Sequence, residues 1–330
     1  MPSNPPLVIG HRGAPGYFPE HSRASYERAL AVGVDAVEPD VVFTADGVAV
    51  VRHENEIGST TDVADHPEFR DRRTTKLVDG GPLTGWFTED FTWEELATLR
   101  CRERLPQLRP QSAEHDGEQP ILRLRDLLDL VDAAETRRVG VVLEVKHATY
   151  FGSIGFDVAE LLAAELRGAG WDTGVRPLIV ESFEQGILRE LRDRGIRGRF
   201  VYLLEAEGSA YDLTAAQGEG APTYAQQLSP AGLDRLAREV DGISLDKRIV
   251  LEDPSVVARA HERGLDVFVW TCRPENLFLD PKFRRAGADA DLGDWQGEWR
   301  RIAETGVDGV FVDHPDLGVA VFSGHSGSPR

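Results

Sequence analysis

Short apolar segments rich in Val, Ile, Leu and Phe recur along the whole chain, and polar segments of helical periodicity separate most of them. These segments are nearly continuous in apolar character, which is typical of strands that are covered on both faces. They span residues 7–10, 36–44, 48–53, 140–146, 178–183, 199–204, 242–246, 267–271 and 309–313. The helical patterns, with a period of about 3.6, span residues 20–31, 124–133, 156–166, 183–191, 233–240, 256–263 and 295–304. Such an alternation predicts a parallel α/β sheet.

The number of apolar segments favours a closed barrel. Nine segments are one more than the eight strands of an α/β barrel. Asp46-Gly47, between residues 36–44 and 48–53, is a two-residue hairpin signal, so these segments are expected to pair antiparallel. One of them need not belong to the parallel sheet. We therefore predict an α/β fold of the TIM (β/α)8 barrel class.

The long segment from about residue 54 to residue 120 breaks the alternation and contains one modest helical piece, residues 93–99. An interruption of this kind is typical of an insertion over one rim of a barrel, where function is carried. We expect a single domain over residues 1–330, with this insertion over the C-terminal rim, rather than two domains of ordinary size.

Composition and charge exclude several classes of partner. The chain is 41% hydrophobic and 28% charged, values close to globular averages. Its 37 Lys and Arg against 56 Asp and Glu give a net charge of −19. The summed negative field works against binding of nucleic acid or an anionic membrane surface. The excess of carboxylates also permits a site for a hard cation.

Cysteine content and the N-terminus bear on location. Cys101 and Cys272 are the only cysteines, so neither a disulfide framework nor a thiolate zinc site is predicted. The N-terminus lacks a basic region, and its apolar stretch, residues 7–9, is too short for a signal peptide. We expect a cytoplasmic location, or a periplasmic or secreted one if a signal peptide was removed, without stable membrane insertion. The sequence does not predict an oligomeric state.

Side chains that can carry chemistry gather at the ends of the predicted strands. They are His11, Arg12, Glu38, Asp40, His53, Glu144, Lys146, Glu181, Phe183, Trp270 and Thr271. Active sites of α/β barrels are built at the C-terminal strand ends, so we expect these side chains to converge on one face.

Glu38 and Asp40 are two residues apart on a strand, so both side chains point to the same face and can share a cation. If Asp46-Gly47 forms a two-residue turn, Ala45 pairs with Val48, and counting outward places Asp40 opposite His53. The alternative is an exposed strand edge with solvated charges, which Pro39 fits. We favour the cation site, because hard cations need such oxygen-rich clusters.

Glu144 and Lys146 also alternate onto a common face, at the end of a very apolar segment. They form either a structural ion pair at the barrel mouth or a functional pair, in which Glu144 joins the carboxylates and Lys146 faces an anion. At the first strand end, the His11 imidazole beside the Arg12 guanidinium suits binding and protonation of a phosphate.

Several motifs in order along the chain carry a resemblance. They are Gly10-His-Arg-Gly-Ala-Pro-Gly-Tyr-Phe-Pro-Glu-His-Ser, Val37-Glu-Pro-Asp-Val, Val51-Arg-His-Glu, Leu143-Glu-Val-Lys and Val269-Trp-Thr-Cys-Arg. Together they resemble the glycerophosphodiester phosphodiesterase family, in particular its periplasmic-type branch. That branch shares the Thr-Thr-Asp-Val stretch at residues 60–63 and the long middle segment. The resemblance covers the chain from Leu7 to about Val321.

The resemblance implies a set of residue roles. It implies that His11 and His53 are the general acid and base. It also implies a divalent cation, commonly Ca²⁺ or Mg²⁺, with Glu38, Asp40 and Glu144 as its ligands. For the substrate, it implies Arg12 and Lys146 at the phosphoryl oxygens, Glu20 supporting the first loop or touching the head group, Phe183 and Trp270 lining the glycerol pocket, and Arg273 as a contact. The implied reaction is hydrolysis of small-molecule glycerophosphodiesters to sn-glycerol 3-phosphate and an alcohol.

The sequence departs from the family pattern at three positions. Glu54 follows His53 where the family usually has Asp, and Pro39 can donate no ladder hydrogen bond. Glu181 stands where the family tends to have a small or amide residue. This added carboxylate could alter head-group choice or pair with Arg12.

Three alternatives remain open. A phospholipase C- or D-like enzyme of the same barrel superfamily would favour an exposed apolar rim or a basic interfacial patch. Residues 86–87 and 91–93 could form an apolar lip, although large aromatic side chains usually pack in a core. A non-catalytic ligand-binding barrel is disfavoured by the presence of both His11 and His53. An amidohydrolase-like metal barrel should carry two histidine ligands on its first strand, where this chain presents His11 with Arg12.

Overall fold

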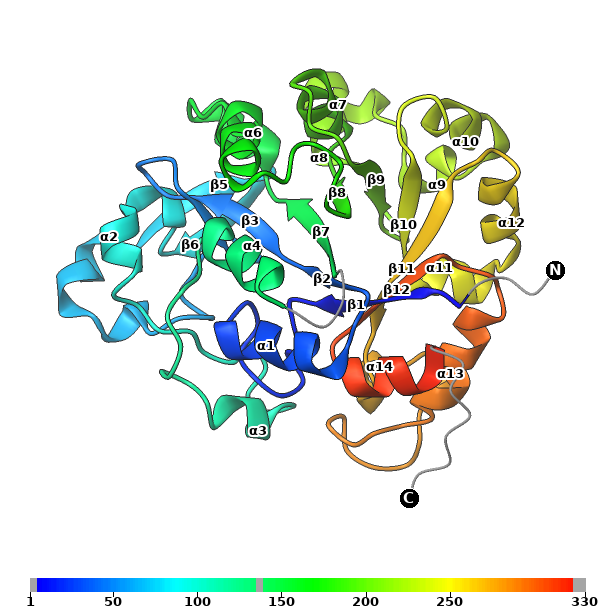
Figure 1. The fold of residues 1–330 in the computed structure, drawn as a ribbon, viewed down its shortest axis with the longest axis horizontal. Helices are drawn as coiled ribbons and strands as arrows, with labels where there is room; N and C mark the ends of the chain where they lie inside the picture. The colour runs from blue at the N-terminus through cyan, green and yellow to red at the C-terminus, as the bar shows by residue number, and fades with distance from the viewer. Residues whose placement is uncertain (1–4, 135–138, 323–330) are drawn as a thin grey trace.

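Parallel strands close into a barrel in the computed structural model of the protein, which describes residues 5–134 and 139–322 (Figure 1). In spatial order the barrel strands are β2 (Ala36–Glu38), β1 (Leu7–His11), β12 (Gly309–Val312), β11 (Asp266–Cys272), β10 (Gly242–Asp246), β9 (Arg199–Leu204), β8 (Leu178–Ser182) and β7 (Gly140–Val145). The pairing of β2 with β7 closes the ring of eight strands within the described residues. The predicted (β/α)8 barrel class is therefore confirmed.

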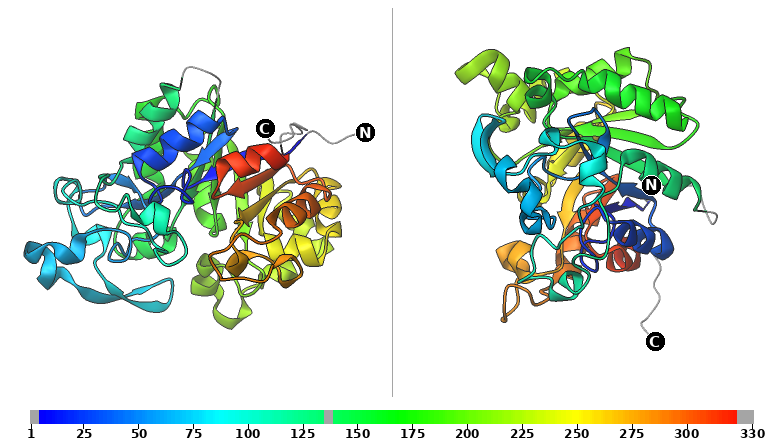
Figure 2. Two further views of the ribbon diagram at one scale, coloured as in Figure 1. Left: turned by 90° about the horizontal axis from the view of Figure 1, so that it is seen from below. Right: turned by 90° about the vertical axis from the view of Figure 1, so that its left-hand side faces the viewer.

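Helices surround the barrel (Figures 1 and 2). They are α1 (Arg23–Val32), α4 (Leu124–Asp132), α5 (Ala148–Ser153), α6 (Val158–Ala169), α7 (Gln185–Asp193), α8 (Tyr211–Gln217), α9 (Tyr224–Gln227), α10 (Pro230–Leu236), α11 (Lys247–Glu252), α12 (Ser255–His261), α13 (Trp295–Ala303) and α14 (Pro315–Phe322). Short 3-10 helices are η4 (Gly218–Gly220), η5 (Asn276–Phe278) and η6 (Pro281–Phe283). No helix in the described ranges combines the length and the apolar character that crossing a membrane requires.

A small apolar cluster, separate from the main core, fills the barrel interior. Its buried members come from six of the barrel strands: Ile9, Ala36, Val142, Val201, Phe268 and Phe311. Trp270 packs against this cluster from the C-terminal side of the barrel. The cluster therefore forms an apolar floor beneath the C-terminal strand ends.

Pro39 divides the predicted segment 36–44 into β2 and β3 (Asp40–Phe43). Val37 pairs with Val141 of β7, and Asp40 pairs with Glu144, so pairing with β7 resumes in the same register beyond the proline. Pro39 has no N–H to donate, but its carbonyl accepts a hydrogen bond from the Glu144 N–H. The proline therefore interrupts one ladder bond without turning the carboxylates away from β7.

The turn between β3 and β4 (Ala49–Val51) differs from the prediction. Thr44 donates its N–H to Val48 O and accepts the N–H of Gly47, so the loop contains the three residues 45–47 rather than two. Gly47 has φ of 78°, the left-handed conformation that commonly ends a three-residue hairpin loop.

The longer turn shifts the hairpin register by one residue. Arg52, rather than His53, donates its N–H to the carbonyl of Asp40 and lies opposite it. The predicted pairing of Asp40 with His53 is therefore wrong. His53 follows β4, beyond the end of the ladder.

The segment after β4 forms a lobe beside the barrel, drawn in cyan in Figures 1 and 2. It contains η1 (Val63–Asp65), η2 (Pro67–Arg72), β5 (Thr74–Val78), β6 (Gly81–Gly85), η3 (Thr88–Asp90), α2 (Trp93–Leu96) and α3 (Pro110–Ala113). Within the described residues, β5 and β6 pair only with each other. The predicted helical piece 93–99 is thus shorter than expected, and the β5–β6 hairpin was not predicted.

The aromatic residues of this lobe pack inward. Phe87 and Phe91 are completely buried, and Trp86 and Trp93 are partly buried against the core. The apolar lip that would favour a lipid-binding rim is therefore not formed by these side chains.

Candidate active site

A cavity of about 960 Å³ opens at the C-terminal ends of the barrel strands. The predicted site residues that line it are His11, Arg12, Glu38, His53, Glu144, Lys146, Phe183, Trp270 and Arg273. Asp40 and Glu20 are buried and are not among its lining residues. The strand-end residues thus converge on one face, as active sites of this fold do.

His11, the last residue of β1, lies against the carboxylate of Asp313. Its Nδ1 atom is 2.6 Å from Asp313 Oδ1, and its ring meets the edge of Phe311. Burial and the nearby charge of Arg12 lower the pKa of His11 to about 4. The imidazole is therefore uncharged at neutral pH and can accept a proton.

Asp313 was not predicted as a site residue, although it ends a predicted strand like the residues that were. Besides His11, it accepts hydrogen bonds from Arg109 at 2.6 Å and from Arg273 at 2.8 Å. Arg273 therefore lines the cavity while anchored to Asp313, and its guanidinium lies over the ring of Phe278. In this position Arg273 both binds Asp313, the partner of His11, and faces the cavity.

Arg109, from the inserted segment, ties that segment to the barrel. It is 6% exposed, and its Nε atom donates to Glu275 Oε1 at 2.8 Å while its other contact goes to Asp313. Removing one partner of a buried ion pair leaves an uncompensated charge.

Replacing Arg109 with methionine is expected to lower the free energy of unfolding by about 3–5 kcal/mol, because the buried Glu275 carboxylate loses its Arg109 partner and Asp313 keeps only Arg273. Urea unfolding of the purified variant measures the change. The control is Arg259→Met, whose surface pair with Asp253 is expected to contribute no more than about 1 kcal/mol. Equal losses in the two variants would contradict a structural role for the buried pair.

His53 also faces the cavity. Its Nδ1 atom lies 2.6 Å from Glu54 Oε1, and its Nε2 atom lies 3.3 Å from Nζ of Lys146. Burial, with the charges of Arg12 and Lys146, holds the pKa of His53 well below its usual range. His53 is therefore uncharged at neutral pH, like the imidazole on β1, and Glu54 fills the place of the family's usual aspartate.

Arg12 follows β1 in a left-handed conformation, with φ of 54°. Its backbone N–H donates to Glu38 Oε2 at 2.7 Å, and its guanidinium donates to Glu20 at 2.9 Å. Glu20 also accepts from Arg104 of the insertion at 2.6 Å. Glu20 thus supports the first loop from behind the cavity, which is one of the two roles expected of it.

Gly13 is required by the tight packing of this loop. It has φ of 91°, and a Cβ atom at this position would lie 2.5 Å from Ser25 Oγ and 2.7 Å from a Ser25 backbone atom. A side chain at residue 13 would therefore displace the loop that carries Arg12.

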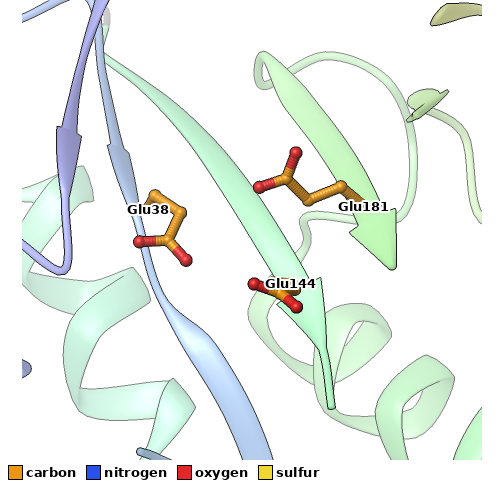
Figure 3. Close-up of side chains that lie close together, drawn as sticks. All are labelled: Glu38, Glu144 and Glu181. Atoms are coloured by element: carbon orange, nitrogen blue, oxygen red, sulfur yellow. The ribbon is translucent and has the colours of Figure 1, made fainter. Parts of the chain in front are cut away.

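Three buried carboxylates meet inside the mouth of the barrel: Glu38, Glu144 and Glu181 (Figure 3). Each offers an oxygen, and these oxygens lie within 4.8 Å of one another. Burial is the main cause that raises their pKa values, to about 8 for Glu144, and the neighbouring carboxylates raise them further. Within the described residues, Glu181 therefore meets these two carboxylates rather than Arg12.

Asp40 lies next to this group but is held differently. Its Oδ2 atom is 2.8 Å from Nε2 of His21 and 3.4 Å from Nε of Arg12. Although burial opposes ionisation, the His21 hydrogen bond and the charges of Arg12 and Lys146 hold the pKa of Asp40 well below its usual range. Its Oδ1 atom is buried without a hydrogen-bond partner. Asp40 is thus an ionised carboxylate beside the cluster of Glu38, Glu144 and Glu181.

The carboxylate cluster fits a divalent cation. Three buried acids at this spacing repel one another unless they bind protons or a positive ion. The Oε2 atom of Glu181 is buried without a hydrogen-bond partner, so it is free to act as a ligand. Oxygen atoms of carboxylates are the ligands that Ca²⁺ and Mg²⁺ prefer.

Two aromatic rings and the ammonium group of Lys146 lie beside the carboxylate cluster. Phe183 and Trp270 meet edge to face, with ring centroids 5.7 Å apart. Lys146 donates to Glu144 Oε1 at 2.9 Å, and its Nζ atom lies 5.6 Å from the centre of the Phe183 ring. The cavity therefore combines an apolar surface with cations, carboxylates and two uncharged imidazoles.

Comparison with known proteins places this arrangement in context. The model of the glycerophosphoryl diester phosphodiesterase family matches residues 11–317. Glycerophosphodiester phosphodiesterase GDPD6 of Arabidopsis thaliana is 30% identical over 328 residues, covering 93% of this chain and 83% of that protein. The glycerophosphodiester phosphodiesterase of Treponema pallidum is 26% identical over 350 residues, covering 95% of this chain and 90% of that protein.

Solved structures share the fold. A crystal structure from Silicibacter pomeroyi, described as a glycerophosphoryl diester phosphodiesterase, superposes with a TM-score of 0.69 at 24% identity, covering 98% of this chain and 94% of that one. A phosphodiesterase of Oleispira antarctica, in complex with the product sn-glycerol-3-phosphate, superposes with a TM-score of 0.64 at 19% identity, covering 96% of each chain. At these identities the likeness shows the fold alone.

Proposed function

We propose, since this chain belongs to the glycerophosphoryl diester phosphodiesterase family, that it is an enzyme which hydrolyses glycerophosphodiesters to sn-glycerol 3-phosphate and an alcohol. The relatives named above carry this activity in their names, and one solved neighbour holds sn-glycerol-3-phosphate as its product. The whole chain is taken as one catalytic domain.

One observation carries the proposal: His11 and His53 face the same cavity, and each has a carboxylate beside its Nδ1 atom. A carboxylate at Nδ1 orients an imidazole and stabilises its protonated form, as in other acid and base pairs. The Nε2 atom of each ring is then the one that exchanges a proton with a substrate. A barrel that only binds a ligand has no need of two such pairs.

The residues of the cavity suit each part of the substrate. Arg12 and Lys146 would bind the phosphoryl oxygens, and the Phe183 and Trp270 rings would pack against the glycerol carbons. Arg273 is a further contact for the phosphate or its glycerol hydroxyls.

Proton transfer completes the reaction. His11 takes the proton of the attacking oxygen, which belongs to water or to a glycerol hydroxyl. In the second case the cyclic phosphate that forms is opened by water to give glycerol 3-phosphate. His53 acts in its protonated form, which the negative charge of a bound phosphodiester favours, and gives its Nε2 proton to the oxygen of the departing alcohol as the phosphorus–oxygen bond breaks. The low pKa of His11 suits a base at neutral pH, and the Glu54 carboxylate stabilises the protonated form of His53.

Glu38 and Glu144, with Asp40 and Glu181, would hold a divalent cation, Ca²⁺ or Mg²⁺. Asp40 is the third ligand that the family resemblance implies, and Glu181 is the residue that this structure adds. When bound, the cation would neutralise developing negative charge and lower the pKa of a coordinated oxygen.

The proposed function is tested by measuring release of glycerol 3-phosphate with a coupled enzyme. The substrates are glycerophosphodiesters with choline, ethanolamine, glycerol or inositol as the alcohol. Each is also supplied in acylated form, for which release of the free or phosphorylated alcohol is measured instead, because hydrolysis of an acylated compound yields no glycerol 3-phosphate. We expect turnover of the deacylated compounds. Turnover of the acylated compounds alone would support the phospholipase alternative, and no turnover of either would support a ligand-binding barrel.

A further inference from the structure

A chain of four side chains runs from the cavity to the tip of the inserted hairpin. Its first link is the contact of His53 Nδ1 with Glu54 Oε1, at 2.6 Å. Glu54 Oε2 lies 3.2 Å from Nε2 of His147, and Nδ1 of the same ring lies 2.6 Å from Asp79 Oδ2. Both nitrogens of His147 thus have a carboxylate partner, and each oxygen of Glu54 lies against a different histidine.

The two outer members come from separate parts of the fold. Asp79 lies at the turn between β5 and β6, and His147 lies between β7 and α5. Both have left-handed backbones, with φ of 48° and 53°, a conformation in which Asp, Asn and His are enriched. The hairpin tip is seated against the barrel side, since a Cβ at Gly80 would lie 3.3 Å from the Tyr211 ring. Asp79 is therefore placed by the docking of the hairpin.

The charges along this chain alternate. Burial opposes the charge on His147, yet its hydrogen bonds to Asp79 and Glu54 raise its pKa to about 9, so it is a cation at neutral pH. Although burial opposes ionisation, the hydrogen bond with His147 and the close contact with His53 hold the pKa of Glu54 well below its usual range. The negative Glu54, the positive His147 and the negative Asp79 thus follow His53 in that order.

We propose that Asp79 and His147 are positioning residues for His53: they fix Glu54 so that its Oε1 atom faces His53 Nδ1. This holds the ring in one orientation, with Nδ1 protonated and Nε2 directed to the substrate. The inference rests on the proposed function, in which His53 protonates the leaving oxygen. It gives the inserted hairpin, whose Asp79 also lines the cavity, a part in catalysis.

The test compares Asp79→Asn with the wild-type enzyme on two substrates. Asparagine keeps the size and the left-handed backbone of residue 79 but weakens the hydrogen bond to His147. For glycerophosphocholine, whose alcohol needs protonation, we expect kcat to fall by about 10- to 100-fold, the usual range for loss of an outer partner of an oriented histidine. For glycerol p-nitrophenyl phosphate, whose leaving group needs no acid, we expect kcat to change by less than about threefold. KM is expected to stay unchanged for both.

Matched variants separate positioning from stability. Asp71→Asn makes the same substitution at an exposed site of the insertion and should leave both rates unchanged. Asp79→Glu restores the carboxylate and should recover part of the lost kcat. In a His53→Ala background, Asp79→Asn should cause no further loss, because both changes act through the same proton transfer.

A direct readout comes from long-range ¹H–¹⁵N spectra of histidine-labelled protein. In the wild type, His53 should be a single tautomer with the proton on Nδ1, and in Asp79→Asn a mixture of tautomers. Equal loss on both substrates, further loss in the His53→Ala background or unchanged spectra would overturn the proposal. If the wild type releases no glycerol 3-phosphate at all, the proposed function fails, while the spectra still test the positioning of His53.

Discussion

Alanine at His11 or His53 is expected to lower turnover of a glycerophosphodiester by about 10²–10⁴-fold, the usual contribution of one positioned proton-transfer group. Both rings face the cavity, and both have a carboxylate oxygen 2.6 Å from Nδ1. The removed group in each case is therefore an oriented imidazole rather than a packing element. Steady-state kinetics at saturating substrate measures the effect on kcat.

Binding of a divalent cation should be nearly unchanged in both variants, because neither imidazole belongs to the carboxylate cluster. Isothermal titration with Ca²⁺ or Mg²⁺ checks this. The matched control is His261→Ala, since His261 lies on the surface and pairs with Asp308. Wild-type rates in either site variant would refute the assignment of acid and base, and the double variant should be little slower than the worse single one.

Removal of divalent cations is expected to abolish activity, and added Ca²⁺ or Mg²⁺ is expected to restore it. Glu38, Glu144 and Glu181 are buried side by side and need a counter-charge to be ionised together. In Glu144→Gln, cation affinity should fall by about 100-fold or more, because affinity for hard cations follows the number of charged oxygen ligands.

A readout independent of activity is available from thermal unfolding. At a cation concentration 100 times the dissociation constant, a bound ion adds about 2.7 kcal/mol to the stability of the native state. Glu144→Gln should lose this increment, and the exposed Glu262→Gln should keep it. Comparing Asp40→Asn with Glu181→Gln shows which of the two completes the site. Activity that survives thorough chelation would contradict the cation role.

The barrel could be predicted from the sequence because its strands are apolar on both faces. Each such strand is a nearly continuous run of Val, Ile and Leu, and parallel strands place all their C-terminal ends at one rim. The site residues His11, Glu144 and Trp270 each lie at or near such an end, so their convergence needed no knowledge of the strand order.

The hairpin register could not be predicted in the same way. A turn of two residues and a turn of three differ by one position, and Asp46-Gly47 is compatible with both. A shift of one residue exchanges the partner of Asp40 from His53 to Arg52. Register is decided by which faces the surrounding core buries, and that information is not local.

The side chains that the insertion contributes next to the site could not be predicted from the sequence either. Asp79, Arg104 and Arg109 lie in a segment without a regular hydrophobic period, and their side chains meet the site only after the lobe docks on the barrel. Asp313 is different, because it ends a predicted strand and could have been included by the rule that identified the others. Glu181 was recognised as a departure from the family pattern, but its place in the carboxylate cluster depends on the order of the strands.

The contacts of the inserted lobe bear on how such enzymes can diverge or be recombined. Arg104 binds Glu20, which binds Arg12, and Arg109 binds Asp313, which binds His11. Asp79 binds His147, which contacts Glu54 beside His53. A chimera that takes this lobe from a relative would keep its barrel and its cavity residues. It would work only if the donor lobe carried the same three side chains at matching places. Exchange of either part alone would therefore have to preserve these contacts.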